Sequence, residues 1–552
     1  MHNYYKWKGL MILLLVFALG GLTSHMLSEE LTGGDVQSAA KVAGLTFTDS
    51  EIELMLPDLE SAREDYAANR EHEISNGLAP ALVFNPILPG IDIPKDQEEL
   101  RYSSPGQITV PDNRNELAWM TVRELAELIR TRQISSVELT EFFLDRLRTY
   151  DDTLHCVVTL TEERALAAAR RADAEIARGE YRGLLHGIPY GAKDLLAARG
   201  YPTTWGAMPY KDQNIDMDAT VIERLEEAGA VLVAKLTLGA LAWGDVWFGG
   251  RTRNPWNAET GSSGSSAGSA SAVSAGLVPF AIGTETLGSI VSPSTVCGVT
   301  GLRPTFGRVS RHGAMALSWT MDKIGPIARS AEDCAIVFAA IYGPDGQDFH
   351  MYDAPFNYDG TASPTTIKVG YLKSAFESNY GFKAQDSVSL QVLRDLGYEL
   401  VPIELPEAPE LGMILSAEAA AAFDELTRSD RDDELVRQQR RAWPNTFRAG
   451  RLIPAVEYIQ ANRLRTQLCL DMEEVFEQID VYVHPSWSST SLGITNHTGH
   501  PAVVVPNGFR QNGLPTSITF TAGLFEEGKA LRVAKAFQDA TDWDEQHPTL
   551  TQ

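Results

Sequence analysis

A tract dense in serine and glycine, residues 261–305, is the part of this chain best suited to nucleophilic chemistry. It supplies many hydroxyl groups and closely spaced backbone N–H groups, which can serve as nucleophiles and as anion-binding donors. Flexible linkers share this composition. This tract, however, continues into a predicted helix, 270–275, and then into the apolar run 277–282. A glycine-rich stretch inside core-forming sequence indicates a constrained loop rather than a linker.

A second residue with chemical potential, Lys193, lies upstream within His186–Asp194. Gly187 and Pro189 indicate a turn before an apolar stretch, and the neighbourhood of Lys193 is weakly charged. Taken alone, such a lysine is usually a surface residue whose aliphatic stem lies along apolar atoms. Only its combination with the serine tract suggests a chemical role.

Together the two segments resemble the amidase-signature family of serine hydrolases. Ser265 and Ser289 lie 24 positions apart, which is the separation in the family pattern. The likeness covers residues 116–545 and leaves the N-terminal segment outside it. The matching segments are Gly187–Asp194, the Gly/Ser loop Gly264–Ser269 with alanine at one usual glycine, the nucleophile loop Gly283–Ile290, Cys297–Thr305, Thr495–Pro501 and Gly513–Pro515.

The resemblance implies a mechanism. Ser289 would be the nucleophile that forms an acyl-enzyme, Ser265 would bridge it to the base, and Lys193 would be that base. The family holds the bridging serine behind a non-proline cis peptide bond. The backbone N–H groups that would form the oxyanion hole belong to Thr286, Leu287, Gly288 and Ser289. The resemblance implies no cofactor, no metal ion and a small-molecule amide substrate. Fatty acid amides, aryl amides, peptide amides, carbamates and small carboxamides all stay open as substrates.

This mechanism requires a neutral lysine. An amide carbonyl is a weak electrophile with a poor leaving group, so an activated nucleophile, an oxyanion site and an acid for the amine are all needed. An unperturbed lysine, with a pKa of ~10.4, is almost wholly protonated at pH 7 and cannot accept a proton. Burial lowers a lysine pKa by several units. We therefore expect Lys193 to lie in a buried, partly apolar pocket.

Three residues near the nucleophile depart from the family pattern. Glu285 stands where many members have aspartate, Leu287 where many have glycine, and Val291 where many have arginine. The three catalytic positions are unaffected, but the substrate range and the shape of the pocket are put in doubt. A positive φ at position 287 would make leucine strain the loop. We expect instead an ordinary conformation, with the Leu287 side chain forming one wall beside Ser289.

Two motifs admit other interpretations. Residues 264–268 fit G-x-S-x-G, the nucleophile elbow of another hydrolase class, with Ser266 as its nucleophile. An elbow follows a strand, however, and the preceding residues 251–260 are polar and contain proline. His497 and His500 could suggest a metal site, but no acidic or cysteine ligands lie nearby, so we interpret them as pocket or loop histidines.

Two alternative functions stay open. The same family contains the A subunit of the amidotransferase that passes ammonia from glutamine to an aminoacyl-tRNA, in the cytosol and beside partner chains. The export-like N-terminus and the 115 residues that precede the likeness argue against this alternative. The other alternative is a non-catalytic scaffold, with Leu287 as the lesion, and it predicts no acylation of Ser289.

The net charge and the N-terminal segment limit the kinds of partner that we expect for this chain. The formal net charge is −26, from 47 Lys and Arg against 73 Asp and Glu, and such a surface disfavours nucleic-acid binding. Lys6 and Lys8 precede the apolar run 9–22, which predicts a signal peptide or a membrane anchor over residues 1–24 and an exported or anchored protein. Any membrane contact would be through this segment. The four cysteines are widely spaced and predicted to be free and mostly buried.

The surrounding elements predict an α/β fold with a large mixed central sheet, flanked by helices and preceded by a helical N-terminal extension. The extension, 25–115, includes a helix over 48–66 that Pro57 would kink or divide, and a proline-rich connector, 79–111. The catalytic domain would cover 116–545. Its predicted helices follow capping boxes at Thr121 and Ser135 and cover 162–180, 418–441 and 456–479. Its predicted strands include 231–234, 369–372, 481–483 and 502–506.

Overall fold

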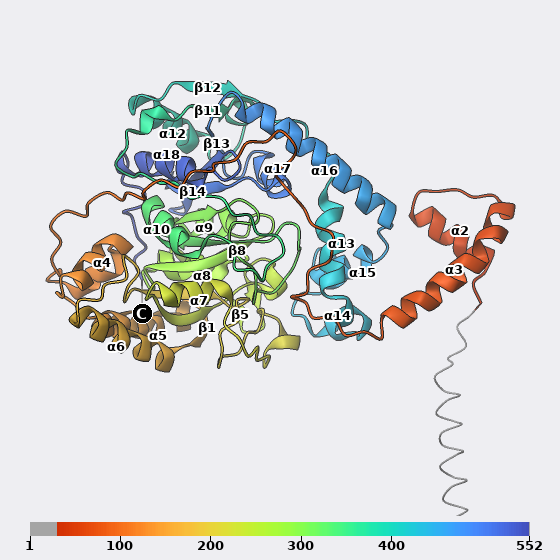
Figure 1. Cartoon of the computed structure of the whole chain (residues 1–552), viewed down its shortest axis with the longest axis horizontal. Coiled ribbons are helices and arrows are strands. Elements are labelled where there is room, and N and C mark those ends of the chain that lie inside the picture. The colour runs from red at the N-terminus through yellow and green to blue at the C-terminus, as the bar shows by residue number, and fades with distance from the viewer. Residues whose placement is uncertain (1–29, 551–552) are drawn as a thin grey trace, which may run out of the picture. The chain divides into compact units, whose positions relative to one another are not determined.

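The computed structural model describes residues 30–550 of the chain (Figure 1). The expected signal or anchor segment, 1–24, lies outside the described residues. Within them, no helix is both long enough and apolar enough to cross a membrane. The chain divides after Ser75 into two compact units.

The N-terminal unit contains α2 (Gly33–Val42) and α3 (Asp49–Asn69), and each begins at a capping box, made by Thr32 and Thr48. The predicted helix is therefore present, but Pro57 does not divide it, since α3 is one element on both sides of the proline. Its missing N–H leaves the carbonyl of Glu53 without a helical partner. Both residues are exposed, so water can satisfy that carbonyl.

The connector before the catalytic domain packs on the second unit and forms part of it. The Asn76 side chain bonds both the N–H and the carbonyl of Ala316, at 2.7 and 2.9 Å. Farther along, the Gln97 amide donates to the carbonyl of Phe356 at 2.7 Å. The division between units therefore falls at Ser75, whereas the sequence suggested a boundary near Asn115. The connector is extended, as its prolines predict, because it follows the surface of the second unit.

An 11-stranded sheet forms the centre of the second unit, in the order β1-β3-β2-β8-β10-β9-β14-β15-β13-β11-β12. It is mixed: β2 is parallel to β3 and β8, and β11 is parallel to β12 and β13, while the other pairs are antiparallel. The strands are β1 Val157–Leu160, β2 Pro189–Lys193, β3 Val231–Leu236, β8 Phe280–Glu285, β9 Thr300–Arg303, β10 Lys323–Ala328, β11 Val369–Leu372, β12 Leu400–Ile403, β13 Val481–Pro485, β14 Ala502–Phe509 and β15 Pro515–Ala522. Two small hairpins lie outside this sheet, β4 Val246–Trp247 with β5 Gly250–Arg251, and β6 Arg253–Asn254 with β7 Asn257–Gly261.

Helices flank the sheet, as predicted, and a group of them, α13 to α16, forms a layer beside it (Figure 1). The capping boxes at Thr121 and Ser135 are both present. The helices of this unit are α4 Val122–Arg130, α5 Ser136–Leu154, α6 Glu162–Ala177, α7 Thr220–Glu227, α8 Ala267–Ser274, α9 Val291–Cys297, α10 Ala331–Ile341, α11 Lys373–Glu377, α12 Lys383–Asp395, α13 Gly412–Ala422, α14 Asp424–Arg428, α15 Trp443–Gly450, α16 Ala455–Phe476, α17 Ser491–Thr498 and α18 Glu527–Asp539. Short 3-10 helices cover η1 Arg114–Trp119, η2 Met208–Tyr210, η3 Ala240–Ala242, η4 Pro364–Thr366 and η5 Arg431–Glu434.

One predicted helix is wrong. Residues 418–441 do not form a continuous helix but contain the end of α13, then α14 and η5, followed by non-helical chain. Phe423 interrupts the first two helices with φ −119° and ψ 32°, and Asp430 adopts the left-handed region at φ 56°. The local sequence is helix-forming, but the chain must turn here to bury Phe423 and Leu426 in the core.

Candidate active site

The carboxyl ends of two neighbouring parallel strands place Lys193 beside the segment that leads into the nucleophile loop. β2 ends at Lys193, and β8 runs beside it with Ala192 opposite Ile282. β8 then continues through Thr284 and Glu285 into the nucleophile loop. In α/β sheets, ligand sites lie at this edge, because loops after adjacent parallel strands meet there.

Lys193 is fully buried, and its Nζ contacts three hydroxyl groups. Nζ lies 2.9 Å from Ser265 Oγ, 3.1 Å from Ser266 Oγ and 2.8 Å from Thr284 Oγ1. Burial lowers the pKa of Lys193 from 10.5 to about 7, although the carboxylates of Asp322 and Glu285 act to raise it. The expectation that Lys193 is buried is confirmed.

Ser265 and its neighbour Ser266 have different environments. Ser265 follows the Gly264–Ser265 peptide bond, which is cis as the resemblance implies. The Ser266 hydroxyl donates to the carbonyl of Thr284 at 3.0 Å and accepts the N–H of the same residue at 3.1 Å. Its remaining lone pair accepts from Lys193 Nζ. The donor and both acceptor positions of the Ser266 hydroxyl are therefore occupied, and its bonds to Thr284 join the Gly/Ser loop to β8.

The nucleophile loop is held to the Gly/Ser loop by its own backbone. The N–H of Ser266 donates to the carbonyl of Ser289 at 3.1 Å. Gly288 has φ 88°, in the left-handed region that favours glycine, whereas Leu287 does not have a positive φ. The expectation that Leu287 adopts an ordinary conformation is confirmed, because Gly288 is the residue of this turn with a positive φ.

Glu285 fixes the other end of this loop. It is fully buried, and its Oε2 accepts the N–H groups of Ile290 and Val291 at 2.8 and 2.9 Å. Its Oε1 accepts from Arg303 at 2.9 Å and from Asn496 at 2.8 Å. Burial alone would raise the pKa of Glu285, but Arg303 and these hydrogen bonds outweigh it and lower the pKa to about 2. The carboxylate therefore stays ionised and joins the start of α9 to β9 and α17.

The backbone N–H groups of the predicted oxyanion hole are free of protein acceptors. In the part of the chain that the structure describes, no protein group accepts a hydrogen bond from the N–H of Thr286, Leu287, Gly288 or Ser289. A free N–H group beside a nucleophile can stabilise negative charge on a reacting carbonyl oxygen. The assignment of these groups to an oxyanion hole stays a prediction.

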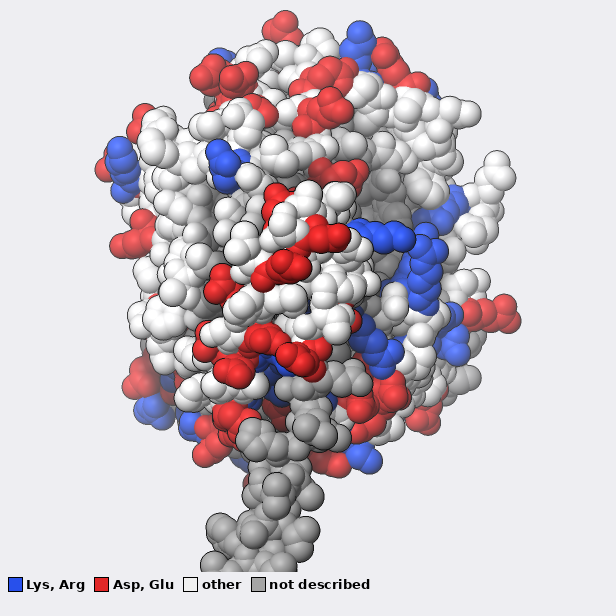
Figure 2. Space-filling view, turned by 90° about the vertical axis from the view of Figure 1, so that its right-hand side faces the viewer, with Lys and Arg blue, Asp and Glu red and all other residues white. Residues whose placement is uncertain are grey.

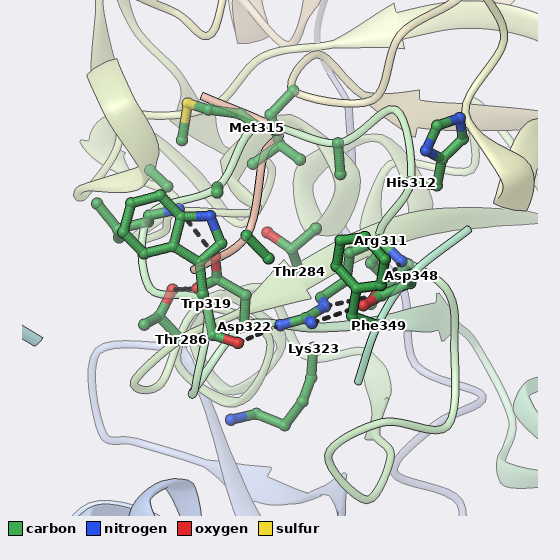
Figure 3. Close-up of a pocket in the computed structure, with 18 of the residues that line it drawn as sticks. Thr284, Thr286, Arg311, His312, Met315, Trp319, Asp322, Lys323, Asp348 and Phe349 are labelled. Carbon is green, nitrogen blue, oxygen red and sulfur yellow. Dashed lines mark hydrogen bonds and ion pairs between the residues drawn. The ribbon is translucent and has the colours of Figure 1, made fainter. Parts of the chain in front are cut away.

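A cavity lies beside Thr284 and Thr286, at the start of the nucleophile loop (Figure 3). Its wall includes Thr284, which contacts Lys193, and Thr286, whose hydroxyl donates to Asp322 at 2.6 Å. The second oxygen of Asp322 accepts the N–H groups of Leu317 and Ser318. Figure 3 also shows the pairing of Arg311 with Asp348 in this wall. Asp322 therefore joins Thr286 to the backbone of Leu317 and Ser318.

Ser289 itself lines a second cavity, a cleft of about 1160 Å³ that includes space open to solvent. The two cavities share Ala242, Thr286 and Leu317, which form the partition between them. Leu287 also lines the cleft, and its side chain is 43% exposed. The prediction that this side chain forms a wall beside Ser289 is therefore confirmed.

Four residues of the site were not assigned a role from the sequence: Thr284, Arg303, Asp322 and Asn496. Arg303 and Asn496 belong to segments that match the family pattern, which was the only available signal for them. Asp322 lies outside every matching segment and reaches the site through the loop before β10. The sequence could not show these contacts, because each depends on how distant segments pack.

The other interpretations of the motifs are less well supported by the structure. A strand, β7, does precede Ser266, contrary to expectation, but it belongs to a two-stranded hairpin outside the central sheet. His497 Nδ1 donates to the carbonyl of Gly493, and His500 Nδ1 pairs with the hydroxyl of Thr498.

All four cysteines are free and buried, as predicted. Acidic side chains are spread over the face shown in Figure 2, in keeping with the net charge of −26.

Comparison with known proteins places the chain among amide-processing enzymes. The family model described as Amidase matches residues 138–531. The A subunit of glutamyl-tRNA(Gln) amidotransferase from Coxiella burnetii is 33% identical, over 78% of this chain and 99% of its own length. The protein of the same name from Bacillus velezensis is 34% identical, again over 78% of this chain and 99% of its own length.

Solved structures agree with this likeness. The native peptide amidase from Stenotrophomonas maltophilia is 29% identical, with a TM-score of 0.68 over 76% of this chain and 96% of that protein. An amidase family protein from Bacillus anthracis is 26% identical, with a TM-score of 0.70 over 83% of this chain and all of that protein. The fold described above is therefore the fold of these enzymes.

Proposed function

Because this chain belongs to the Amidase family, whose enzymes act on amide C–N bonds, we propose that it hydrolyses a small-molecule carboxamide through an acyl-enzyme on Ser289. The observation that supports this most is the buried contact between Lys193 Nζ and Ser265 Oγ, at 2.9 Å. With a pKa near 7, about half of the lysine is neutral at pH 7 and able to accept a proton.

The hydrogen bonds around Lys193 support its role as the base. A neutral amine has two N–H donors and one lone pair. Ser266 Oγ and Thr284 Oγ1 are positioned to accept the two N–H groups, at 3.1 and 2.8 Å. The lone pair is then directed to Ser265, which can donate its hydroxyl proton to Nζ. We propose that Ser265 in turn accepts the proton of Ser289 and so relays it to the base; the structure supports the step between Ser265 and Lys193.

The proposed reaction moves protons through this relay in both directions. Ser289 Oγ attacks the amide carbon, its proton passes to Ser265 Oγ, and the proton of Ser265 passes to Lys193 Nζ. The carbonyl π pair moves to oxygen, where the N–H groups of the nucleophile loop stabilise the charge. When the C–N bond breaks, the relay returns a proton to the leaving nitrogen. Water then attacks the acyl-enzyme by the same relay and releases the carboxylic acid.

A serine-directed probe tests this proposal. A fluorophosphonate should label Ser289, with the modified residue identified by mass mapping of peptides. Ser289→Ala should abolish labelling, while Ser266→Ala, as the matched control, should retain it. An adduct on Ser266 would instead support the nucleophile elbow, and no adduct at all would support a non-catalytic scaffold. A panel of amides, assayed for release of ammonia or amine, then identifies the substrate.

The second candidate is one component of an amidotransferase. It is favoured by the identity of 33–34% with proteins named as the A subunit of glutamyl-tRNA(Gln) amidotransferase, over nearly their whole length. These relatives share the family with hydrolases, so the same serine relay suits both candidates. Ammonia release from glutamine, with slow turnover of other amides, would favour this second candidate.

We further propose that residues 1–24 export the chain or anchor it in a membrane, because Lys6 and Lys8 precede an apolar run. N-terminal sequencing of protein from its native host distinguishes a cleaved signal from a retained anchor. Export would separate this chain from the cytosolic partners of an amidotransferase. A mature N-terminus at Met1 in a cytosolic fraction would contradict the proposal.

A further inference from the structure

The cleft at Ser289 has an uncharged lining that is rich in aromatic and aliphatic side chains. None of the residues that line it, within the described part of the chain, carries a charged side chain. Its wall contains Trp243, Trp443 and Trp487, together with four leucines. From this lining we propose that the substrate is a neutral amide with a bulky apolar group, and that free glutamine is excluded. This inference rests on the proposed function.

The aromatic wall is held in place by contacts outside the cleft. The Trp443 indole N–H donates to the carbonyl of Leu241 at 2.9 Å, and its ring stacks on Phe447 at 5.1 Å. Trp243 lies edge-on to Trp443, with ring centroids 6.4 Å apart. Because the indole N–H of Trp443 is already bonded, this ring offers the cleft an apolar surface. Fixed aromatic walls favour flat or branched apolar groups over flexible polar ones.

The polar groups of the cleft are largely bonded within the protein. The Ser292 hydroxyl pairs with that of Ser263 at 2.7 Å. The Ser486 hydroxyl pairs with Thr519 at 2.7 Å, and that of Ser489 with His484 at 3.0 Å. The free donors nearest the nucleophile are therefore backbone N–H groups, which suit a carbonyl oxygen. They provide no ionic partner for a substrate.

Arg437, Arg311 and Asp322, which lie near residues of the cleft wall, each have partners within the protein. The Arg437 guanidinium lies over the Trp243 ring, 4.9 Å from its centroid, and contacts Asp245 at 3.4 Å. In the adjoining cavity, Arg311 is bonded to Asp348, and Asp322 accepts three hydrogen bonds. None of these groups is unpaired and directed at the cleft.

Free glutamine carries an α-ammonium and an α-carboxylate group at pH 7. Moving either charge from water into an uncharged, largely apolar cleft carries a large penalty, because no opposite charge compensates for lost hydration. A neutral aromatic amide carries no such penalty and gains from burial of its apolar surface. Val291 lines the cleft at a position where many family members have arginine, so this position supplies no cation here.

A matched pair of substrates tests the inference on the full chain. The neutral amide is 4-phenylbutanamide, and its partner carries a carboxylate at the para position of the ring. We expect kcat/KM to be at least about 100-fold higher for the neutral amide, and L-glutamine to be turned over more slowly still. Ser289 labelling by a fluorophosphonate is measured on the same protein.

Three variants and one control test the lining directly. Trp443→Ala should lower kcat/KM for 4-phenylbutanamide at least about tenfold while changing that for acetamide little, because only the larger acyl group reaches the ring. Trp543→Ala, which removes an indole outside the cleft, is the matched control. Val291→Arg should lower the ratio of kcat/KM for the neutral amide to kcat/KM for the carboxylate at least about tenfold, because the guanidinium can pair with the carboxylate. Since a buried arginine could disturb α9, Trp487→Arg, at a position 51% exposed on the same cleft, gives a second test of that prediction.

The outcomes distinguish the substrate inference from the proposed function. Labelled Ser289 with equal or better turnover of the carboxylate or of glutamine would overturn the substrate inference and leave the serine mechanism intact. An unlabelled Ser289 with no turnover of either amide would overturn the proposed function, and the inference with it. Three results together would support both the proposed function and the substrate inference. Ser289 is labelled, the neutral amide has the higher kcat/KM, and either arginine variant reduces that difference.

Discussion

The pH dependence of Ser289 acylation is the sharpest test of the buried lysine. If Lys193 must be neutral to accept a proton, its pKa near 7 makes the neutral fraction rise about tenfold between pH 6 and pH 8. A lysine with an unperturbed pKa of ~10.5 would give a rise of about 100-fold over the same interval. Since a fluorophosphonate needs no knowledge of the substrate, its second-order labelling rate can be measured from pH 5 to pH 9.

Replacing Asp322 by asparagine should move this profile to lower pH. The Asp322 carboxylate raises the pKa of Lys193, so its removal should lower that pKa further, by about one unit for a nearby buried charge. The labelling rate at pH 6 should then rise about fivefold relative to the plateau at pH 8. The ratio of rates is used because the loss of the bond to Thr286 can lower both rates together.

Asp348→Asn provides the matched control. This carboxylate lines the same cavity but is held by Arg311, and it is not among the groups that shift the pKa of Lys193. Its ratio of rates at pH 6 and pH 8 should match that of the unmodified protein. A profile that rises 100-fold without a plateau would refute the depressed lysine pKa. A shift to higher pH in Asp322→Asn would refute the electrostatic coupling.

Four other outcomes follow from the site. Ser289→Ala should lower turnover by at least about 10³-fold in a steady-state assay, and Ser266→Ala far less; equal losses would contradict the assignment of the nucleophile. Lys193→Arg should be nearly inactive in the same assay, because guanidinium stays protonated, and near-normal activity would remove the lysine from the mechanism. Leu287→Gly should retain labelling of Ser289 but change the preference among acyl lengths, measured as kcat/KM; a uniform change would point to loop flexibility instead. Deletion of residues 1–24 should yield soluble, active protein by gel filtration and labelling, and an insoluble or inactive product would show that the segment packs on the fold.

The sequence predicted the site by motif and the fold by pattern, but it could not predict what supports the site. Lys193 and Ser265 were identified because short segments match a known spacing, and their contact in the structure agrees with it. Asp322 and Asn496 lie in separate segments, and only tertiary packing brings them to the nucleophile loop. The failed helix over 418–441 has a similar cause, since burial of Phe423 overrides local helix propensity.

Glu285 illustrates how a departure from the family pattern can be accommodated. Its carboxylate accepts two backbone N–H groups at the start of α9 and two side-chain donors, Arg303 and Asn496. All four bonds are to an ionised acceptor, which strengthens each of them. The loop is therefore fixed at both ends, by this carboxylate and by the bond from Ser266 to the carbonyl of Ser289. A pre-organised loop keeps its N–H groups available for a developing charge.

The relay and the cleft carry different kinds of information about function. Lys193, Ser265 and the backbone N–H groups would contact only the reacting atoms, so they suit any amide and cannot separate a hydrolase from an amidotransferase component. The residues that line the cleft would contact the rest of the substrate, and they offer aromatic and aliphatic surface without charge. The identity of 33–34% with the amidotransferase proteins is an average over the shared length and does not describe the residues that line the cleft. The lining of the cleft is therefore the basis of our proposal that the substrate is a neutral, apolar amide, whereas the choice between a hydrolase and an amidotransferase component depends on the assays of amide and glutamine turnover.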